Sequence, residues 1–224
     1  MTRSTKVTKK TCSTKKSDGY SKRTERFNGC IKREINELVS RNATTKSRCL
    51  VLDSESGNTS RHLSSKRVSA ENIHVPNYSQ SACEKLENLG YSTPYCATLT
   101  DHLGSLSSNS MDIVWFDYCG TWGESMQEDT VMLFKNGILA SGGEFSLTSS
   151  MHGLALHDGV HNKLSDYGGT ISDFIKSVGR INGYNVYPVT SFFYGIVGKG
   201  RKRVLAKRNP NSASMLFQMY KCEK

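Results

Sequence analysis

Two acidic residues, Asp53 and Asp117, each follow a short apolar run in this chain of 224 residues. Residues 49–52 lead into Asp53 and a turn of small polar residues at 54–58, and residues 113–116 lead into Asp117. Such runs are typical of strands buried in a parallel sheet, and ligands of open α/β sheets bind at the carboxyl edge of these strands. A carboxylate at that edge can accept hydrogen bonds from a ligand or take a proton from a nucleophile.

The turn that follows Asp53 contains one glycine, Gly57, and leads into a helical pattern at Ser60. Small side chains let a ligand lie against backbone N–H groups, and the helix dipole adds positive potential at this end. The stretch therefore predicts a site for a polar, nucleotide-like ligand. Any α/β protein can contain a turn of this kind, so an ordinary structural turn is the alternative.

Strands and helices are predicted to alternate around these acids. Strands are expected at 49–53, 72–77, 96–99, 111–122, 144–148, 184–194 and 214–220. Helices are expected from Arg26, from Ser60, from a Ser79 cap to Gly90, over 126–140, and from a capping box at Thr170 to Gly183. This order predicts an α/β fold with a seven-stranded, mostly parallel sheet that has one antiparallel strand.

The net charge of +10 lies entirely in residues 1–48, which hold 14 basic and 4 acidic residues. The beginning of the chain is mostly Lys, Thr and Ser and cannot bury enough apolar surface to fold. We therefore expect a disordered basic arm at 1–25, a helix at 26–47 and one domain at 48–224. A second basic cluster lies at 199–208. Such clusters attract phosphate backbones, although a targeting or solubilising tail has a similar composition.

The seven cysteines form no CxxC pair, which favours a reduced intracellular setting. No apolar run approaches the ~20 residues that cross a bilayer, and no signal-peptide pattern follows Met1. We expect a nuclear or cytoplasmic protein that is not secreted and has no membrane partner; its oligomeric state is not predicted. His152, His157 and His161 do not have the spacing of a zinc signature, so no metal is predicted.

Three stretches resemble motifs of the class I S-adenosylmethionine-dependent methyltransferase family. The resemblance as a whole runs from about residue 48 to residue 222. The segment Val51-Leu52-Asp53-x-x-x-Gly57 is similar to the first motif, residues 112–118 to the fourth, and residues 139–148 to the turn before the fifth strand.

The resemblance has departures. Glu55 and Thr59 stand where the family usually has glycine. Asn77 stands where the family has an acid that binds the ribose hydroxyls, although its amide could bind a hydroxyl and Glu55 could supply a carboxylate.

The resemblance implies a three-layer, Rossmann-like methyltransferase fold with S-adenosylmethionine as cofactor. The implied cofactor-binding residues are Asp53, Ser54, Glu55, Gly57, Asn58, Asn77, Asp101 and Asp117. Asp117 and Tyr118 are the candidate catalytic residues. The candidate substrate-binding residues are Trp122, which could stack on a base, and His152, Lys199, Arg201, Lys202 and Arg203.

The predicted function is methyl transfer from S-adenosylmethionine to nucleic acid, with RNA slightly favoured over DNA. Methyl transfer needs few catalytic side chains, and the basic clusters suit a polyanion. Cys119 could serve as a covalent nucleophile, as in pyrimidine C5-methyltransferases, but those families have proline where this chain has Tyr118. Two other functions stay open. One is methylation of a small molecule or a protein. The other is an inactive methyltransferase fold that binds nucleic acid or a partner.

Overall fold

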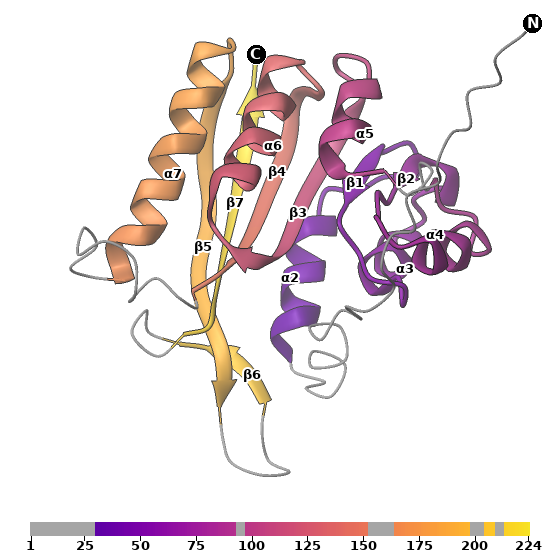
Figure 1. Ribbon diagram of the computed structural model, residues 1–224, viewed down its shortest axis with the longest axis horizontal. Helices are drawn as coiled ribbons and strands as arrows, with labels where there is room; N and C mark the ends of the chain where they lie inside the picture. Colours follow the sequence, from indigo (N-terminus) through magenta and orange to yellow (C-terminus); the bar gives the residue numbers. More distant parts are fainter. Residues whose placement is uncertain (1–29, 93–96, 152–163, 198–203, 209–212) are drawn as a thin grey trace, which may run out of the picture.

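The computed structural model describes residues 30–92, 97–151, 164–197, 204–208 and 213–224. A seven-stranded sheet with the order β2-β1-β3-β4-β7-β5-β6 lies between two layers of helices (Figure 1). The strands are β1 (Cys49–Val51), β2 (Ile73–His74), β3 (Met111–Thr121), β4 (Leu139–Ser150), β5 (Asn185–Val197), β6 (Val204–Lys207) and β7 (Met215–Glu223).

The strands β1 to β4 pair in parallel, while β7 is antiparallel to both β4 and β5, and β6 is antiparallel to β5. It follows that β5 points in the same direction as β1 to β4, and that β6 and β7 are reversed. The carboxyl ends of β1, β3, β4 and β5 therefore meet at one edge of the sheet, here called the carboxyl edge.

Three sequence predictions about the sheet are wrong. The expected strand at 96–99 is absent from its described part, because Leu99 already begins a helix that is capped by Thr98; only Ser92, upstream, makes an isolated bridge to His74. The seventh strand is β6 instead, so two strands are reversed rather than one. Finally, β4 starts at Leu139, well before the predicted residue 144, because α6 ends at Lys135.

The helices divide into two layers, each with its own core. They are α2 (Cys30–Ser40), α3 (Asn58–Ser65), α4 (Gln80–Glu87), α5 (Leu99–Ser105), α6 (Glu124–Lys135) and α7 (Leu164–Ile181), with a short 3-10 turn at Ala70–Asn72. Leu103, Leu133 and Ile171 place α5, α6 and α7 against one face of the sheet. Ile35 of α2, like Leu63 of α3 and Leu86 of α4, belongs to the core on the other face.

Local sequence signals explain several helix boundaries. The Ser79 side chain accepts a hydrogen bond from the Ala82 N–H at the start of α4, as predicted. Gly90 and Gly183 adopt positive φ after α4 and α7, a conformation that glycine tolerates best. The predicted capping box at Thr170 is wrong, because α7 already begins at Leu164 and Thr170 lies inside it.

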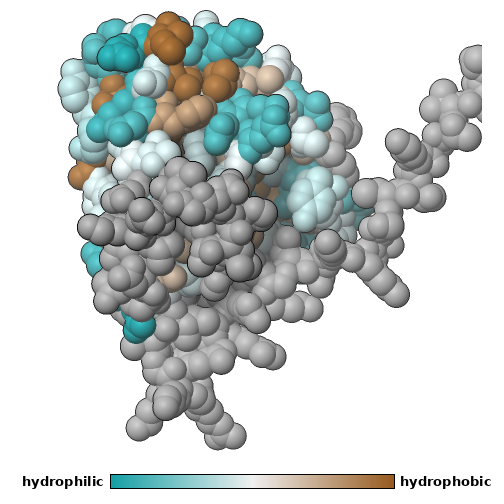
Figure 2. Space-filling view, turned by 60° about the vertical axis from the view of Figure 1, so that its left-hand side comes forward, coloured by the Kyte–Doolittle hydropathy of each residue, from teal (hydrophilic) through white to brown (hydrophobic). Residues whose placement is uncertain are grey.

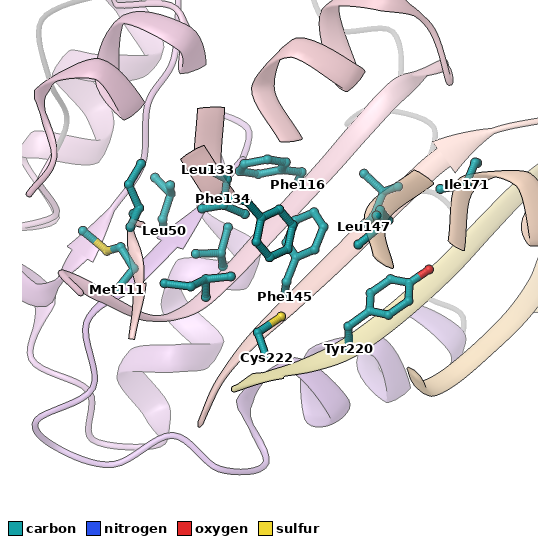
Figure 3. Packing of buried hydrophobic residues seen from close by; sticks show 14 of the residues in the cluster. Leu50, Met111, Phe116, Leu133, Phe134, Phe145, Leu147, Ile171, Tyr220 and Cys222 are labelled. Atoms are coloured by element: carbon teal, nitrogen blue, oxygen red, sulfur yellow. The ribbon is translucent and has the colours of Figure 1, made fainter. Parts of the chain in front are cut away.

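Side chains of β3 alternate between the two cores, and this alternation positions the candidate site. Val114 and Phe116 face α5 to α7, whereas Ile113 and Trp115 face α2 to α4. Figure 3 shows Phe116, Phe134 and Phe145 packed together, and the Phe116 and Phe145 ring centroids lie 5.3 Å apart. Alternation then directs Asp117 to the α2 side and Tyr118 to the opposite side.

The described surface over α7 mixes hydrophilic and hydrophobic residues (Figure 2). Ile181 at the end of α7 is 79% exposed, and Tyr187 in β5 is 50% exposed. Both lie toward the amino ends of the parallel strands, away from Asp117. No helix among the described residues is long and apolar enough to cross a membrane.

Candidate functional site

Asp53 and Asp117 are neighbours at the carboxyl edge. Val51 of β1 is paired with Trp115 of β3, and the next N–H, that of Leu52, donates to the Trp115 carbonyl at 3.1 Å. Each acid lies two residues beyond this pair on its own strand. The two apolar runs of the sequence therefore end with their acidic residues side by side at this edge.

Lys32 of α2 reaches this place from outside the sheet. Its Nζ donates to Asp117 Oδ2 at 2.6 Å and lies 5.1 Å from the centroid of the Trp115 ring. The Lys32 and Asp117 side chains are only 23% and 12% exposed. Asp117 Oδ1 is buried and has no hydrogen-bond partner among the described residues, so this oxygen can accept a hydrogen bond from a ligand.

Lys32 was not predicted from the sequence. A weak signal existed, because Lys32 is next to Ile31 on a helix whose residues Ile31, Ile35 and Val39 form an apolar stripe. A charged residue at the border of a buried stripe can lie against the domain with its head group at a polar site. The partner of such a lysine depends on the packing of the helix, which one sequence does not specify.

The Asp53 carboxylate holds the turn and the start of α3 together. Oδ1 accepts from the Ser54 N–H at 2.9 Å, and Oδ2 accepts from the Ser60 N–H at 2.9 Å and the Ser60 hydroxyl at 3.0 Å. Burial raises the pKa of Asp53, while the hydrogen bonds from Ser60 and Ser54 and the charge of Lys32 oppose this rise. The Asp53 carboxylate therefore fixes the conformation of the turn and joins it to the start of α3.

The turn itself depends on Gly57, which has φ of +60° and is the residue before α3. A Cβ atom at this position would lie 3.2 Å from Leu86 Cδ2, so both the backbone and the space favour glycine. Ser54 and Ser56 join their hydroxyls at 2.7 Å, and Asn58 donates to Ser56 Oγ at 3.2 Å. These contacts form a compact polar turn above Asp53.

Three further predicted cofactor residues are engaged with protein groups. Glu55 accepts from Lys85 Nζ at 2.6 Å on the surface. Asn77 donates to the Asp53 carbonyl at 3.0 Å and accepts from the Ser79 N–H at 2.9 Å. Asp101 belongs to the capping box of α5, where its carboxylate accepts from the Thr98 hydroxyl at 2.7 Å. Asn77 lies beside the turn, whereas Asp101 lies at a helix start rather than at the expected strand end.

Tyr118 and Trp122 lie on the other side of the sheet from Lys32. The Tyr118 hydroxyl donates to Asp129 Oδ2 at 2.7 Å, and burial followed by the Asp129 carboxylate raises the pKa of Tyr118. Trp122 packs on Phe174 of α7 with ring centroids 5.5 Å apart. The structure does not bring these two aromatic side chains together with Asp117.

The remaining predicted residues lie outside the described ranges: His152, Lys199, Arg201, Lys202 and Arg203, together with the arm at 1–25. The described residues on either side of residues 198–203 show at which edge of the sheet this segment begins and ends. Because β5 points toward the carboxyl edge, Val197 at its end and Val204 at the start of β6 both lie at that edge. Figure 1 shows this end of β5 and β6 projecting beside α2.

No group of three or more His, Cys, Asp or Glu side chains in the described part of the chain could hold a metal ion. A cavity of about 330 Å³ lies at the amino ends of the parallel strands, lined in part by Asp112, Gly143 and Glu144. Glu144 there is bound by Asn42 at 2.6 Å and Arg41 at 3.1 Å. This cavity is separate from Asp53 and Asp117.

No family model matches the sequence, and no curated protein matches it. Solved structures do match. The chain is similar to YcgJ from Bacillus subtilis, with a TM-score of 0.55 and 9% identity over 86% of this chain and 99% of that one. It is also similar to HI0767 from Haemophilus influenzae, a proposed methylase, with a TM-score of 0.53 and 10% identity over 87% and 98%.

A proposed sarcosine dimethylglycine methyltransferase from Galdieria sulphuraria has a TM-score of 0.50 and 12% identity over 86% of this chain and 83% of that one. At identities this low the likeness establishes the fold alone. The chain has the Rossmann-like α/β fold of class I S-adenosylmethionine-dependent methyltransferases, as the sequence motifs predicted.

Proposed function

We propose that this chain transfers a methyl group from S-adenosylmethionine to nucleic acid, and to RNA in preference to DNA. The observation that carries the proposal is the Lys32–Asp117 pair at the carboxyl edge, 2.6 Å apart and next to the Asp53 turn. An acid that is 12% exposed, with one oxygen that has no hydrogen-bond partner among the described residues, beside a compact polar turn, is a suitable place for a nucleophile to meet a methyl donor.

The residues present fit the donor at two points. The Asp53 turn lies at the carboxyl edge, where open α/β sheets bind ligands, and Asp117 Oδ1 is an acceptor without a hydrogen-bond partner among the described residues. The fit is poorer at a third point, the position expected to bind the ribose hydroxyls. Asn77 stands there instead of an acid, and its amide is already bonded to Asp53 and Ser79. When bound, S-adenosylmethionine would supply an electrophilic methyl group on a sulfonium ion.

The charge of Lys32 favours a hydroxyl as the nucleophile. An attacking amine gains positive charge, which a nearby ammonium opposes, whereas a hydroxyl that loses its proton gains negative charge, which the ammonium stabilises. Asp117 would orient the hydroxyl and take its proton. RNA carries a 2′-hydroxyl on every ribose and DNA has none, which supports RNA as the substrate.

The topology of the sheet supports a polyanionic substrate. Val197 and Val204 flank the basic segment of the sequence at the carboxyl edge, and Lys207 and Arg208 lie three and four residues after Val204. Lys207 pairs with Glu34 of α2 and lies over the Phe192 ring at 4.6 Å from its centroid. Basic residues at this edge would attract a phosphate backbone toward Asp117.

The proposal is tested by incubating the full chain with methyl-labelled S-adenosylmethionine and either RNA or DNA oligonucleotides of the same sequence. We expect label in RNA and much less in DNA, and no label in an RNA whose riboses are already 2′-O-methylated. Equal labelling of all three nucleic acids would contradict a ribose target. An Asp117→Asn variant serves as the matched negative control.

A second candidate is a fold that binds nucleic acid without methyl transfer. This candidate is favoured by the hydrogen bonds of Asp53 and Asn77. Their polar groups bond to each other and to the turn rather than pointing outward. Calorimetry with S-adenosylmethionine separates the two candidates, because the inactive fold predicts no binding. Methylation of a small molecule would instead give labelled product without nucleic acid.

A further inference from the structure

A positive charge is built into the wall of the candidate site. Lys32 Nζ lies against Asp117 and the face of the Trp115 ring, and its charge also lowers the pKa of Asp53 against the effect of burial. The ammonium therefore acts on both carboxylates of the carboxyl edge. Because its side chain is 23% exposed, its charge is only partly screened by water.

The helix that carries Lys32 is anchored along its length. Ile31, Ile35 and Val39 are fully or almost fully buried. Glu34 pairs with Lys207 of β6, and Glu37 pairs with Lys66 at 2.7 Å. Burial of the three apolar side chains holds the Lys32 backbone in place, while the two ion pairs are exposed and contribute little, so the positive charge is a fixed property of the site.

We infer that Lys32 makes the site favour the spent cofactor, S-adenosylhomocysteine, over the methyl donor. The inference rests on the proposed function, because it takes the donor to bind beside Asp117. In the transfer, the S–CH3 bond breaks and leaves its electron pair on sulfur, an O–CH3 bond forms, and the hydroxyl proton passes to Asp117. The donor is a sulfonium cation and the product a neutral thioether, so a nearby ammonium opposes only the donor.

The two charges of the pair act on the sulfonium in opposite directions. Asp117 attracts it and Lys32 repels it, while neither has a net charge interaction with the thioether sulfur. Removing Lys32 leaves an acid that attracts the donor, and removing the Asp117 charge leaves a cation that repels it. The ratio of donor to product affinity therefore rises in Lys32→Met and falls in Asp117→Asn, each by roughly 30-fold, the factor that one unit charge about 8 Å away gives at an effective dielectric constant near 20.

A purely structural role for Lys32 predicts a different pattern. If the ion pair only held α2 in place, its loss would weaken the binding of both ligands by the same factor. Lys66→Met provides a matched control, because Lys66 pairs with Glu37 on the same helix but on the exposed surface. This variant should leave the affinity ratio unchanged.

The experiment is isothermal titration calorimetry of the full chain with S-adenosylmethionine and with S-adenosylhomocysteine. Wild type, Lys32→Met, Asp117→Asn and Lys66→Met are compared after circular dichroism has confirmed their folding. Opposite shifts of the affinity ratio in Lys32→Met and Asp117→Asn support the inference. An unchanged ratio in both, with both ligands bound, overturns it and leaves the proposed function intact.

Failure of wild type to bind either ligand would instead remove the proposed function and the inference with it. If Lys32→Met does not fold, Lys32→Gln keeps a polar side chain without the charge and should raise the ratio in the same direction. The Asp117→Asn arm of the experiment then still decides the sign, since a ratio that does not fall contradicts the role of the pair.

Discussion

Asp117 and Tyr118 are consecutive residues of β3, yet their surroundings differ in kind. Asp117 pairs with Lys32 and keeps one oxygen without a partner among the described residues. Tyr118 faces the other core, and its hydroxyl is committed to Asp129, which also accepts from Thr100 at 2.7 Å. A polar group with spare capacity can bind a substrate, whereas a satisfied network stabilises the fold.

Strand alternation, more than residue chemistry, separates the two roles. Both residues are candidate catalytic residues in the sequence because both belong to the stretch that resembles the fourth motif of the family. A period of two directs them to opposite faces, so only one of them can meet the Asp53 turn. The predictions below test this division between a reactive side and a structural side of β3.

The largest expected effect is on catalysis. Asp117→Asn should lower the rate of methyl transfer to RNA by about 10²- to 10⁴-fold, because the amide cannot accept the proton of the nucleophile. Tyr118→Phe should change the rate by less than about threefold, since its hydroxyl serves Asp129. Initial rates with labelled donor measure both. A severe loss in Tyr118→Phe with little loss in Asp117→Asn would reverse the assignment of the two faces.

The second prediction reverses the order of the two residues for stability. Tyr118→Phe removes a donor from the buried Asp129 carboxylate and should lower the free energy of unfolding by about 1–3 kcal/mol. Urea denaturation followed by circular dichroism measures this change. Tyr187→Phe is the control, because Tyr187 is half exposed and its hydroxyl should contribute little. Equal stability of Tyr118→Phe and wild type would show that the Asp129 network is not structural.

A third prediction concerns the protonation of His102. His102 of α5 is buried, its Nε2 lies 3.3 Å from His74 Nδ1, and burial followed by the charge of His74 lowers the pKa of His102 to about 4. The folded state therefore favours neutral His102. Its contribution to stability is complete above the ordinary pKa of 6.5 and is lost as the pH falls from 6.5 toward 4.

We expect the free energy of unfolding of wild type to decline over this interval by up to about 3 kcal/mol more than that of His102→Gln. Denaturation curves at half-unit pH steps measure the difference between the two proteins. The comparison with His102→Gln removes the contribution of carboxylates, which titrate in both. Parallel curves for the two proteins would mean that His102 becomes protonated without loss of stability.

Much of the fold was predictable because its signals are local. The buried runs before Asp53 and Asp117, the Ser79 cap and the Gly90 stop depend on neighbouring residues and appear where the sequence indicated. The predicted strand at 96–99 failed because the Thr98–Asp101 capping box favours a helix at Leu99. A capping box was assigned to Thr170 instead, where the helix had already begun.

The candidate site was only partly predictable, because its decisive contact is not local. Lys32 and Asp117 are separated by 85 positions, and no spacing rule connects them. The pairing depends on how α2 crosses the sheet, which is determined by burial of Ile31, Ile35 and Val39. Conversely, Glu55 and Asp101 fitted a motif, but protein partners already engage their carboxylates.

The smallest expected effect on the site comes from the basic arm, which precedes α2 in the sequence. Residues 1–24 hold eight Lys and Arg residues. Deleting them should weaken RNA binding and reduce the slope of log affinity against log salt by up to several units, at roughly 0.7–0.9 per lost phosphate contact. Filter binding at several salt concentrations measures the slope.

Lys207→Ala combined with Arg208→Ala provides the contrasting variant at the carboxyl edge, and it should reduce the slope by about two units at most. Neither change should alter the affinity for S-adenosylmethionine, because neither touches Asp53, Asp117 or Lys32. A slope that is the same with and without the arm would assign the arm to targeting or solubility. The attraction for phosphate would then depend on the β5–β6 end of the sheet alone, and the reactive side of β3 would be served by a single basic surface.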